Sequence, residues 1–227
     1  MTWPEEYKAL HRHRLAMMVR LLERHVTVPV VRSLDVGGGG DILDLSDVVR
    51  KRFGAEPHSV DLGEDVELGR RKGLLSRECN IDKEPLPFDD GFFDLVIFAS
   101  VLEHLYNPHF ALGELARVIR PGGLLLLEAP NAVAAARRID ALRGRNPFRW
   151  FNEYNAEKNK SRMVKCSVFY TLGEVERLLA RDYTIRERDY GMHMPRCNPI
   201  KALIRRVVFK LYPGMSDCFA VAARRKG

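Results

Sequence analysis

The stretch Arg32-Ser-Leu-Asp-Val-Gly-Gly-Gly-Gly-Asp41 decides how the rest of the chain is interpreted. The run from Val30 to Val36 predicts a buried strand, and a helix is expected from about Leu43 to Phe53. Four glycines lie between them. Because glycine tolerates positive φ and has no Cβ, such a turn lets a ligand lie against the backbone. The start of the following helix adds free N–H groups.

The charge at this turn narrows the choice of ligand. A dinucleotide fingerprint needs G-x-G-x-x-G, and neither the register from Gly37 nor that from Gly38 ends on glycine. The turn also lacks the G-K-[ST] of a P-loop. Asp35 and Asp41 would repel a pyrophosphate. They suit a ligand with a nucleoside and a positive charge but no phosphate, and S-adenosylmethionine (SAM) is the leading candidate.

At these residues the sequence resembles a known family. Asp35-x-Gly37-x-Gly39 is similar to the first motif of class I SAM-dependent methyltransferases, although Asp41 stands where the family often has a third glycine. The resemblance implies an α/β fold: a Rossmann-like, seven-stranded, mostly parallel sheet with helices on both faces and an antiparallel last strand. It also implies that Asp35, Gly37, Gly38 and Gly39 contact the cofactor.

A second carboxylate follows the next expected strand, His58-Ser-Val-Asp-Leu62. In a βαβ unit an acidic side chain at this point accepts hydrogen bonds from ribose hydroxyls. We therefore expect Asp61, with its neighbour Leu62, to bind the nucleoside. The segment from Gly63 to Arg77 is charged and is predicted to be a loop.

The block Cys79-Asn-Ile-Asp82-Lys-Glu-Pro-Leu-Pro-Phe88 extends the resemblance. In the family an Asp precedes Leu-Pro-Phe by four residues, so the resemblance implies that Asp82 accepts from the adenine amino group. Ile81 and Lys83 would flank the ring. The apolar run Leu95 to Ala99 is expected to be a buried parallel strand.

Candidates for the chemistry follow that strand, in Ser100-Val-Leu-Glu-His-Leu-Tyr-Asn-Pro108. Ligands of open α/β sheets bind at the carboxyl ends of the strands. We expect Ala99 and Ser100 to contact the cofactor and His104 to be the catalytic base. The Glu103–His104 pair resembles one that binds a divalent metal in some relatives together with a further carboxylate. Because Ser100 stands at that third position, we expect no metal.

Two further base candidates, Tyr154 and His193, are weaker. Tyr154 belongs to inserted material, about residues 131–168, that commonly forms the acceptor site in this family. Trp150 and Phe151 lie there beside the arginine-rich stretch Arg137 to Arg149. Aromatic and arginine side chains together can stack on a sugar or a base.

The rest of the chain predicts alternating helices and strands. Asn107 and Pro108 start a helix that we expect to reach Arg120 and to be stopped by Pro121-Gly122-Gly123. Thr171 and Glu174 form a capping box. The remaining expected elements are a strand at Leu124–Leu127, helices at about 132–143 and 199–210, and strands at 182–190 and 218–223.

An amphipathic helix is expected at residues 3–26, with one exception to its pattern. Leu15, Met18, Leu21 and Leu22 share a face, but Arg14 falls on that apolar side. Such a helix packs on the domain or covers the cofactor. We treat residues 1–227 as one domain.

Composition bounds the function classes. The 227 residues carry a formal net charge of +7, and no apolar run approaches the roughly 18 residues that span a bilayer. The N-terminus does not read as a signal peptide, and the four scattered cysteines predict reduced thiols. We therefore expect a cytoplasmic protein.

The sequence predicts a SAM-dependent methyltransferase, similar to the type 11 group, that O-methylates a small molecule or a glycan. Three alternatives stay open. The basic charge favours an RNA methyltransferase, and the N-terminal helix favours a methyltransferase of quinone or lipid precursors. The third alternative is a SAM-binding protein without activity. A homodimer is also left open.

Overall fold

The structure is a computed structural model that describes residues 5–38, 44–149, 168–191, 203 and 207–227, without the side chains of residues 5–11. Its strands are β1 (Arg32–Val36), β2 (Glu56–Asp61), β3 (Leu75–Glu78), β4 (Phe93–Ala99), β5 (Ile119–Pro130), β6 (Tyr183–Gly191) and β7 (Cys218–Arg225). Its helices are α1 (Glu5–His25), α2 (Leu45–Phe53), α3 (Glu64–Arg71), α4 (Pro108–Val118), α5 (Ala135–Leu142) and α7 (Leu172–Leu179), with 3-10 turns η1 (Leu102–His104) and η2 (Pro213–Met215).

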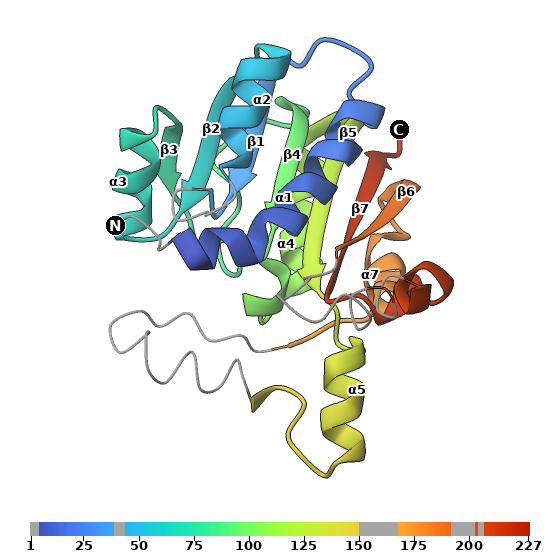
Figure 1. Cartoon of the computed structure of the whole chain (residues 1–227). Helices are drawn as coiled ribbons and strands as arrows, with labels where there is room; N and C mark the ends of the chain where they lie inside the picture. The colour runs from blue at the N-terminus through green and yellow to red at the C-terminus, as the bar shows by residue number, and fades with distance from the viewer. Residues whose placement is uncertain (1–4, 39–43, 150–167, 192–202, 204–206) are drawn as a thin grey trace.

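The strands form a seven-stranded sheet in the order β3-β2-β1-β4-β5-β7-β6 (Figure 1). The pairs from β3 to β5 are parallel. The last strand, β7, is antiparallel to both β5 and β6. The predicted fold class, including the antiparallel last strand, is confirmed.

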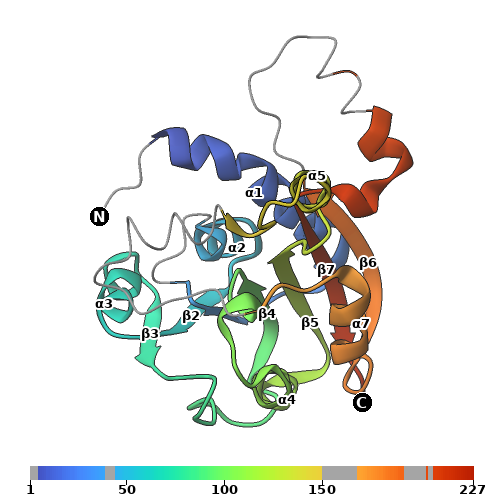
Figure 2. The same ribbon diagram turned by 90° about the horizontal axis from the view of Figure 1, so that it is seen from below.

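Two apolar layers sandwich the sheet, because residues of a strand alternate between its faces. On β4, Leu95 and Ile97 pack with Met17 and Met18 of α1 and with the buried side of α2. Val96 and Phe98 face the other way, toward α4 and α7. Seen from below, α1 and α2 lie on one side of the strands and α4 on the other (Figure 2).

The prediction of a loop from Gly63 to Arg77 is wrong, since the structure places α3 and β3 there. Both elements bury little: α3 buries Val66 and Gly69, and β3 buries Ser76 alone. Gly69 lies so close to the sheet that an added Cβ would come 2.3 Å from the Ser76 Oγ. A pattern with so few apolar residues gives no periodic signal.

The fifth strand begins earlier than expected. Pro121-Gly122-Gly123 does not precede β5 but lies within it, since Ile119 already pairs with Phe93 of β4. The register shifts between Phe93 and Leu95, and Gly122 has a φ of 74°. The Pro-Gly-Gly segment therefore accommodates an irregularity in the ladder.

Both predicted helix caps are confirmed. The Asn107 side chain accepts from the Phe110 N–H at 3.2 Å, and Thr171 and Glu174 form a reciprocal capping box. Most of the helix predicted at 199–210 lies outside the described residues. Residues 207–211, which the structure describes, are helical.

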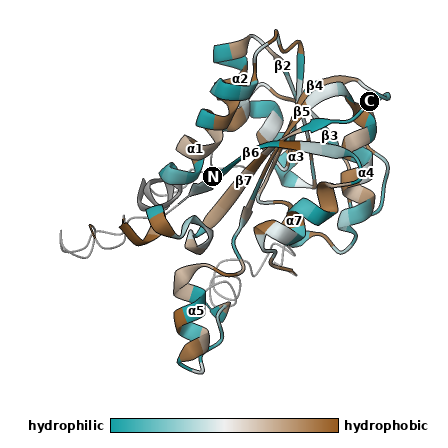
Figure 3. Ribbon diagram, turned by 90° about the vertical axis from the view of Figure 1, so that its right-hand side faces the viewer, coloured by the Kyte–Doolittle hydropathy of each residue, from teal (hydrophilic) through white to brown (hydrophobic). Residues whose placement is uncertain are grey.

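The helix α5 projects away from the sheet and mixes hydrophobic and hydrophilic residues (Figure 3). None of its residues is buried. In the part of the chain that the structure describes, no helix combines the length and apolar character needed to cross a bilayer.

Candidate functional site

The predicted site residues that the structure describes lie at the carboxyl ends of β1, β2 and β4, except Ile81 and Asp82, which follow β3. The strand order reverses between β1 and β4, because β2 and β3 follow on one side and β5 on the other. In open α/β sheets, ligands bind in the crevice outside such a reversal.

The glycine turn after β1 brings bare backbone to this edge. Gly37 has a φ of 78° and donates its N–H to the Val60 carbonyl at 2.8 Å, which ties the turn to β2. A Cβ added at Gly38 would lie 2.5 Å from the Asp35 side chain. Side chains are therefore excluded here by conformation at Gly37 and by contact at Gly38.

The two acidic residues of the first strands differ in setting. Asp35 is buried and accepts a hydrogen bond from the Ser46 hydroxyl at 2.7 Å, which joins β1 to α2. Asp61 ends β2 and is half-buried, and it accepts from the N–H of Leu62 at 2.9 Å. Leu62 leaves 49% of its surface exposed. Gly39 and Asp41 lie outside the described residues.

Asp82 supports the loop that leads into α4. Its carboxylate accepts from the backbone N–H groups of Tyr106 and Asn107 at 2.9–3.0 Å. Ile81 beside it is buried at 6% exposure. Sequence reasoning missed this bracing role, because its partners lie more than 20 positions along the chain. A hydrogen bond from Asp82 to adenine stays a prediction.

The end of β4 is conformationally unusual. Ser100 has a φ of 54°, in the region that favours glycine. Its N–H donates to the Glu128 carbonyl at 3.0 Å and its hydroxyl to the Glu128 carboxylate at 3.1 Å. These bonds hold Ala99 and Ser100 against the end of β5.

Arg14 explains the exception in the amphipathic pattern of α1. Its guanidinium donates to the Ser100 hydroxyl and to both carboxylate oxygens of Glu128, with Nε to Oε1 at 2.9 Å. Burial alone would lower the pKa of Arg14, but pairing with Glu128 raises it above its ordinary value. The arginine on the apolar face is thus one half of a buried ion pair that fixes α1 over β4 and β5.

A third ionisable group, Glu103 of η1, lies in the same region. It is 3% exposed, and among the described residues its Oε2 is a buried atom with no hydrogen-bond partner. Burial, followed by the charge of Glu128, raises the pKa of Glu103 to about 8. Sequence reasoning passed over Glu103 in favour of its neighbour, since no pattern in the sequence marks it as buried.

His104 ends η1, is half-buried, and donates its backbone N–H to the Val101 carbonyl at 2.9 Å. Its role as a base stays a prediction. The other base candidates, Tyr154 and His193, lie outside the described residues, as do Trp150 and Phe151.

The cysteines and the acidic residues add no further cluster to this edge. Cys79 and Cys218 are buried free thiols. Across the described ranges, no three His, Cys, Asp or Glu residues are grouped to hold a metal ion.

A hollow of about 700 Å³ lies at the opposite, amino-terminal edge of the parallel strands, beside Gly122 and Thr184. Its lining is basic and includes Arg186, Arg224 and Lys226. It contains none of the predicted site residues.

The comparisons with known proteins point to methyltransferases. Residues 34–127 match a family described as a methyltransferase domain. The ubiquinone/menaquinone biosynthesis C-methyltransferase UbiE of Cupriavidus necator is 34% identical over 122 residues, which are 51% of this chain and 49% of that protein. The same enzyme of Paraburkholderia xenovorans is 29% identical over 64% of this chain and 62% of its own length. The chain thus aligns with about half to two-thirds of these curated relatives.

Solved structures show the same fold. The geranyl diphosphate C-methyltransferase of Streptomyces coelicolor superposes with a TM-score of 0.62 at 20% identity, covering 95% of this chain and 82% of that one. The N-methyltransferase NodS of Bradyrhizobium japonicum, in complex with S-adenosyl-L-homocysteine, gives 0.58 at 16% identity over 96% and 88%.

The glycine turn comes before Asp61 and Asp82 along the chain. This order and the order of the strands in the sheet fit SAM, the cofactor of this class. Residues 34–127 thus match a methyltransferase domain, and the sheet has the class I methyltransferase fold.

Proposed function

We propose that this chain transfers the methyl group of SAM to a hydroxyl of a small molecule or glycan. One observation carries the proposal. The glycine turn after β1 and the carboxylate at the end of β2 lie side by side, since β1 pairs with β2 through Val36 and Val60. This pair offers bare backbone and a charged acceptor to a nucleoside that carries no phosphate.

Different described residues would contact different parts of the cofactor. Gly37 and Gly38 would lie against its amino-acid part, and Asp61 would accept from its ribose hydroxyls, with Leu62 and Ile81 beside the adenine. Asp35 lies directly against Gly38, and its contact with the cofactor stays a prediction. When bound, the cofactor supplies a methyl group on a sulfonium. The protein then has to hold the acceptor in line, which can contribute about 7–11 kcal/mol.

The relatives favour a second candidate, C-methylation of a quinone precursor. The UbiE proteins carry that activity in their names, but the aligned part covers about half to two-thirds of their length. The basic charge keeps RNA as a third acceptor class.

Cofactor binding is tested by calorimetry on Asp61→Ala. We expect the dissociation constant for SAM to rise at least tenfold, because charge-assisted hydrogen bonds contribute about 1.5–3 kcal/mol each. The melting temperature should not change. Glu64→Ala, an exposed acid three residues further on, is the matched control and should bind as the wild type does. Unchanged affinity in Asp61→Ala would refute this cofactor assignment.

The acceptor is tested with SAM labelled on its methyl carbon. The enzyme is incubated with four pools: polar small molecules, glycans, RNA, and a demethylated quinone in lipid vesicles. Label in the first two pools that hydriodic acid releases as methyl iodide supports O-methylation. Label that resists this cleavage in the quinone pool supports C-methylation instead.

A further inference from the structure

Three charged side chains act on Glu103: Arg14 of α1, Glu128 of β5 and Arg137 of α5. Arg14 is committed to Glu128 by bonds from two of its nitrogens. Arg137 lies over the rings of Phe148 and Phe169, 5.4 and 5.0 Å from their centroids. Among the described residues, the Oε2 atom of Glu103 receives no hydrogen bond from either arginine.

The fold gains nothing visible from this acid. A buried polar group without a hydrogen bond costs about 1–3 kcal/mol, and Oε2 of Glu103 has no partner among the described residues. A methionine of similar length would fill the same space without that cost. Residues that lower stability in this way are concentrated at functional sites.

Its position on the chain points to the transfer site. η1 begins two residues after Ser100, at the end of the strand that the cofactor is expected to contact. The Val168 N–H donates to the Glu103 carbonyl at 3.2 Å, so Val168 lies against η1. Glu103 thus lies between Val168 and Ser100, which is expected to contact the cofactor.

We propose that Glu103, rather than His104, accepts the proton of the acceptor hydroxyl during methyl transfer. This rests on the proposed function. The acceptor O–H bond breaks as oxygen bonds to the methyl carbon. The carbon–sulfur bond breaks with its electron pair left on sulfur, and the proton passes to the Glu103 carboxylate. The carboxyl group returns that proton to solvent before the next turnover.

Arg14 and Glu128 position this group and do not themselves react. Their ion pair holds α1 over the ends of β4 and β5. A base with a pKa near the working pH combines a useful ionised fraction with strong proton affinity. Because the pKa of Glu103 is about 8, kcat should rise with pH up to about that value.

The test uses the full chain, with Glu103→Gln and Glu103→Met as variants and Glu187→Gln as the control. Glu187 is also a carboxylate paired with α1, through Arg24 and His25, but it lies on β6 away from the site. We expect both Glu103 variants to bind SAM within twofold of the wild type in calorimetry. Transfer of labelled methyl to the wild type's acceptor pool should fall at least 100-fold, the lower range for loss of a general base.

Two readouts separate this role from a structural one. The melting temperature of Glu103→Met without ligand should equal or exceed that of the wild type, whereas a structural glutamate would leave it lower. The wild-type rise of log kcat toward pH 8 should be absent from the residual activity of Glu103→Gln.

Either Glu103 variant within threefold of wild-type kcat would overturn the inference and leave the proposed function intact. A fall in melting temperature of both variants, matched by loss of SAM binding, would also overturn it by showing a structural role. A wild type that binds SAM and methylates none of the pools would overturn the proposed function itself.

Discussion

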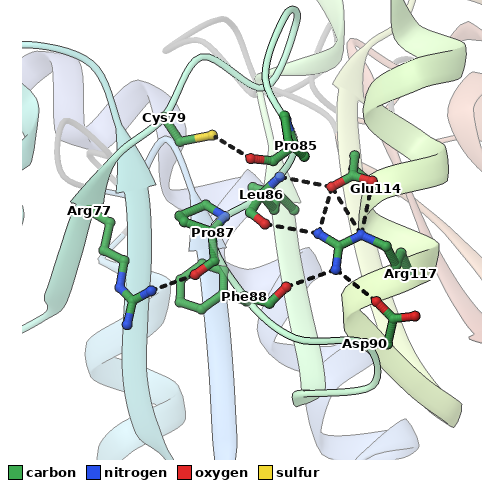
Figure 4. A network of polar contacts seen from close by, with 9 residues as sticks. All are labelled: Arg77, Cys79, Pro85, Leu86, Pro87, Phe88, Asp90, Glu114 and Arg117. Carbon is green, nitrogen blue, oxygen red and sulfur yellow. Dashed lines mark hydrogen bonds and ion pairs between the residues drawn. The ribbon is translucent and has the colours of Figure 1, made fainter.

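Two arginines on helices, Arg117 of α4 and Arg14 of α1, make contrasting ionic contacts. Arg117 donates to the carbonyls of Leu86 and Phe88 at 2.9 and 2.8 Å and pairs with Glu114 and Asp90 (Figure 4). Arg14 pairs with Glu128 next to a second glutamate, Glu103, whose Oε2 has no partner among the described residues.

The Arg117 network is complete, because the acidic side chains that pair with Arg117 also have a structural role. Glu114 accepts from the Leu86 N–H at 2.8 Å, so the pair ties α4 to the segment between β3 and β4. Arg117 lowers the pKa of Glu114, whereas burial raises that of Glu103. A balanced network identifies a structural joint. A buried acid with an unpartnered oxygen identifies a place where stability is given up, and four predictions test that contrast.

The largest expected effect is the pH dependence of stability. An acid whose folded pKa is raised holds its proton in the folded state between its unfolded value, 4.5, and about 8. The unfolded chain releases that proton, so the free energy of unfolding should fall as pH rises through this window, by up to about 5 kcal/mol at about 1.36 kcal/mol per pKa unit. Urea titrations of the wild type and Glu103→Met at pH 5 and pH 8 measure the difference. Parallel pH dependences in the two proteins would contradict the buried, protonated state.

The second-largest effect is expected when one partner of the Arg14–Glu128 ion pair is removed. Arg14→Met leaves the Glu128 carboxylate buried without its cation and should lower the free energy of unfolding by about 3 kcal/mol. The double variant Arg14→Met/Glu128→Met should recover most of that loss, because it removes the uncompensated charge. A double variant no more stable than the single one would argue against an electrostatic origin.

The balanced network should lose less. Arg117→Met leaves two carbonyls without their donor and Glu114 with the Leu86 N–H, but the Arg117 side chain is 29% exposed and water can replace part of its bonding. We expect a loss of about 2 kcal/mol in chemical denaturation. SAM affinity should remain unchanged, and a parallel loss of affinity would place this joint in the binding site.

The smallest effect belongs to the exposed end of α1. Glu187→Gln removes the partner of Arg24 and His25, and exposed pairs contribute about 0–1 kcal/mol. A shift of the melting temperature larger than that of Arg117→Met would reverse the ranking that burial implies.

The sequence predicts most of this fold where residues carry a periodic or chemical signature. The continuous apolar run of β4, the Asn107 cap and the Thr171 capping box are all visible without coordinates. α3 and β3 were missed because edge elements bury few apolar side chains. The predicted strand was shorter than β5 because Pro-Gly-Gly also occurs at helix ends.

The site was less accessible to sequence reasoning, since its key contacts are between distant residues. Arg14 stood out as an exception to its helix, but Glu128 lies 114 positions away. Nothing local distinguishes Glu103 from a solvated glutamate. The Asp35, Asp61 and Asp82 assignments depend on a ligand and stay predictions.

The placement of β7 between β5 and β6 also constrains how the chain can fold. Among the described strands β6 pairs with β7 alone, so it has no neighbour in that sheet until residues 218–225 have been synthesised. The contacts of α1 with Asp189 and Glu187 of β6 must wait for the same event. α1 therefore completes its anchoring only after β7 has formed, and a ribosome-bound chain that ends at residue 217 should leave that helix open to protease.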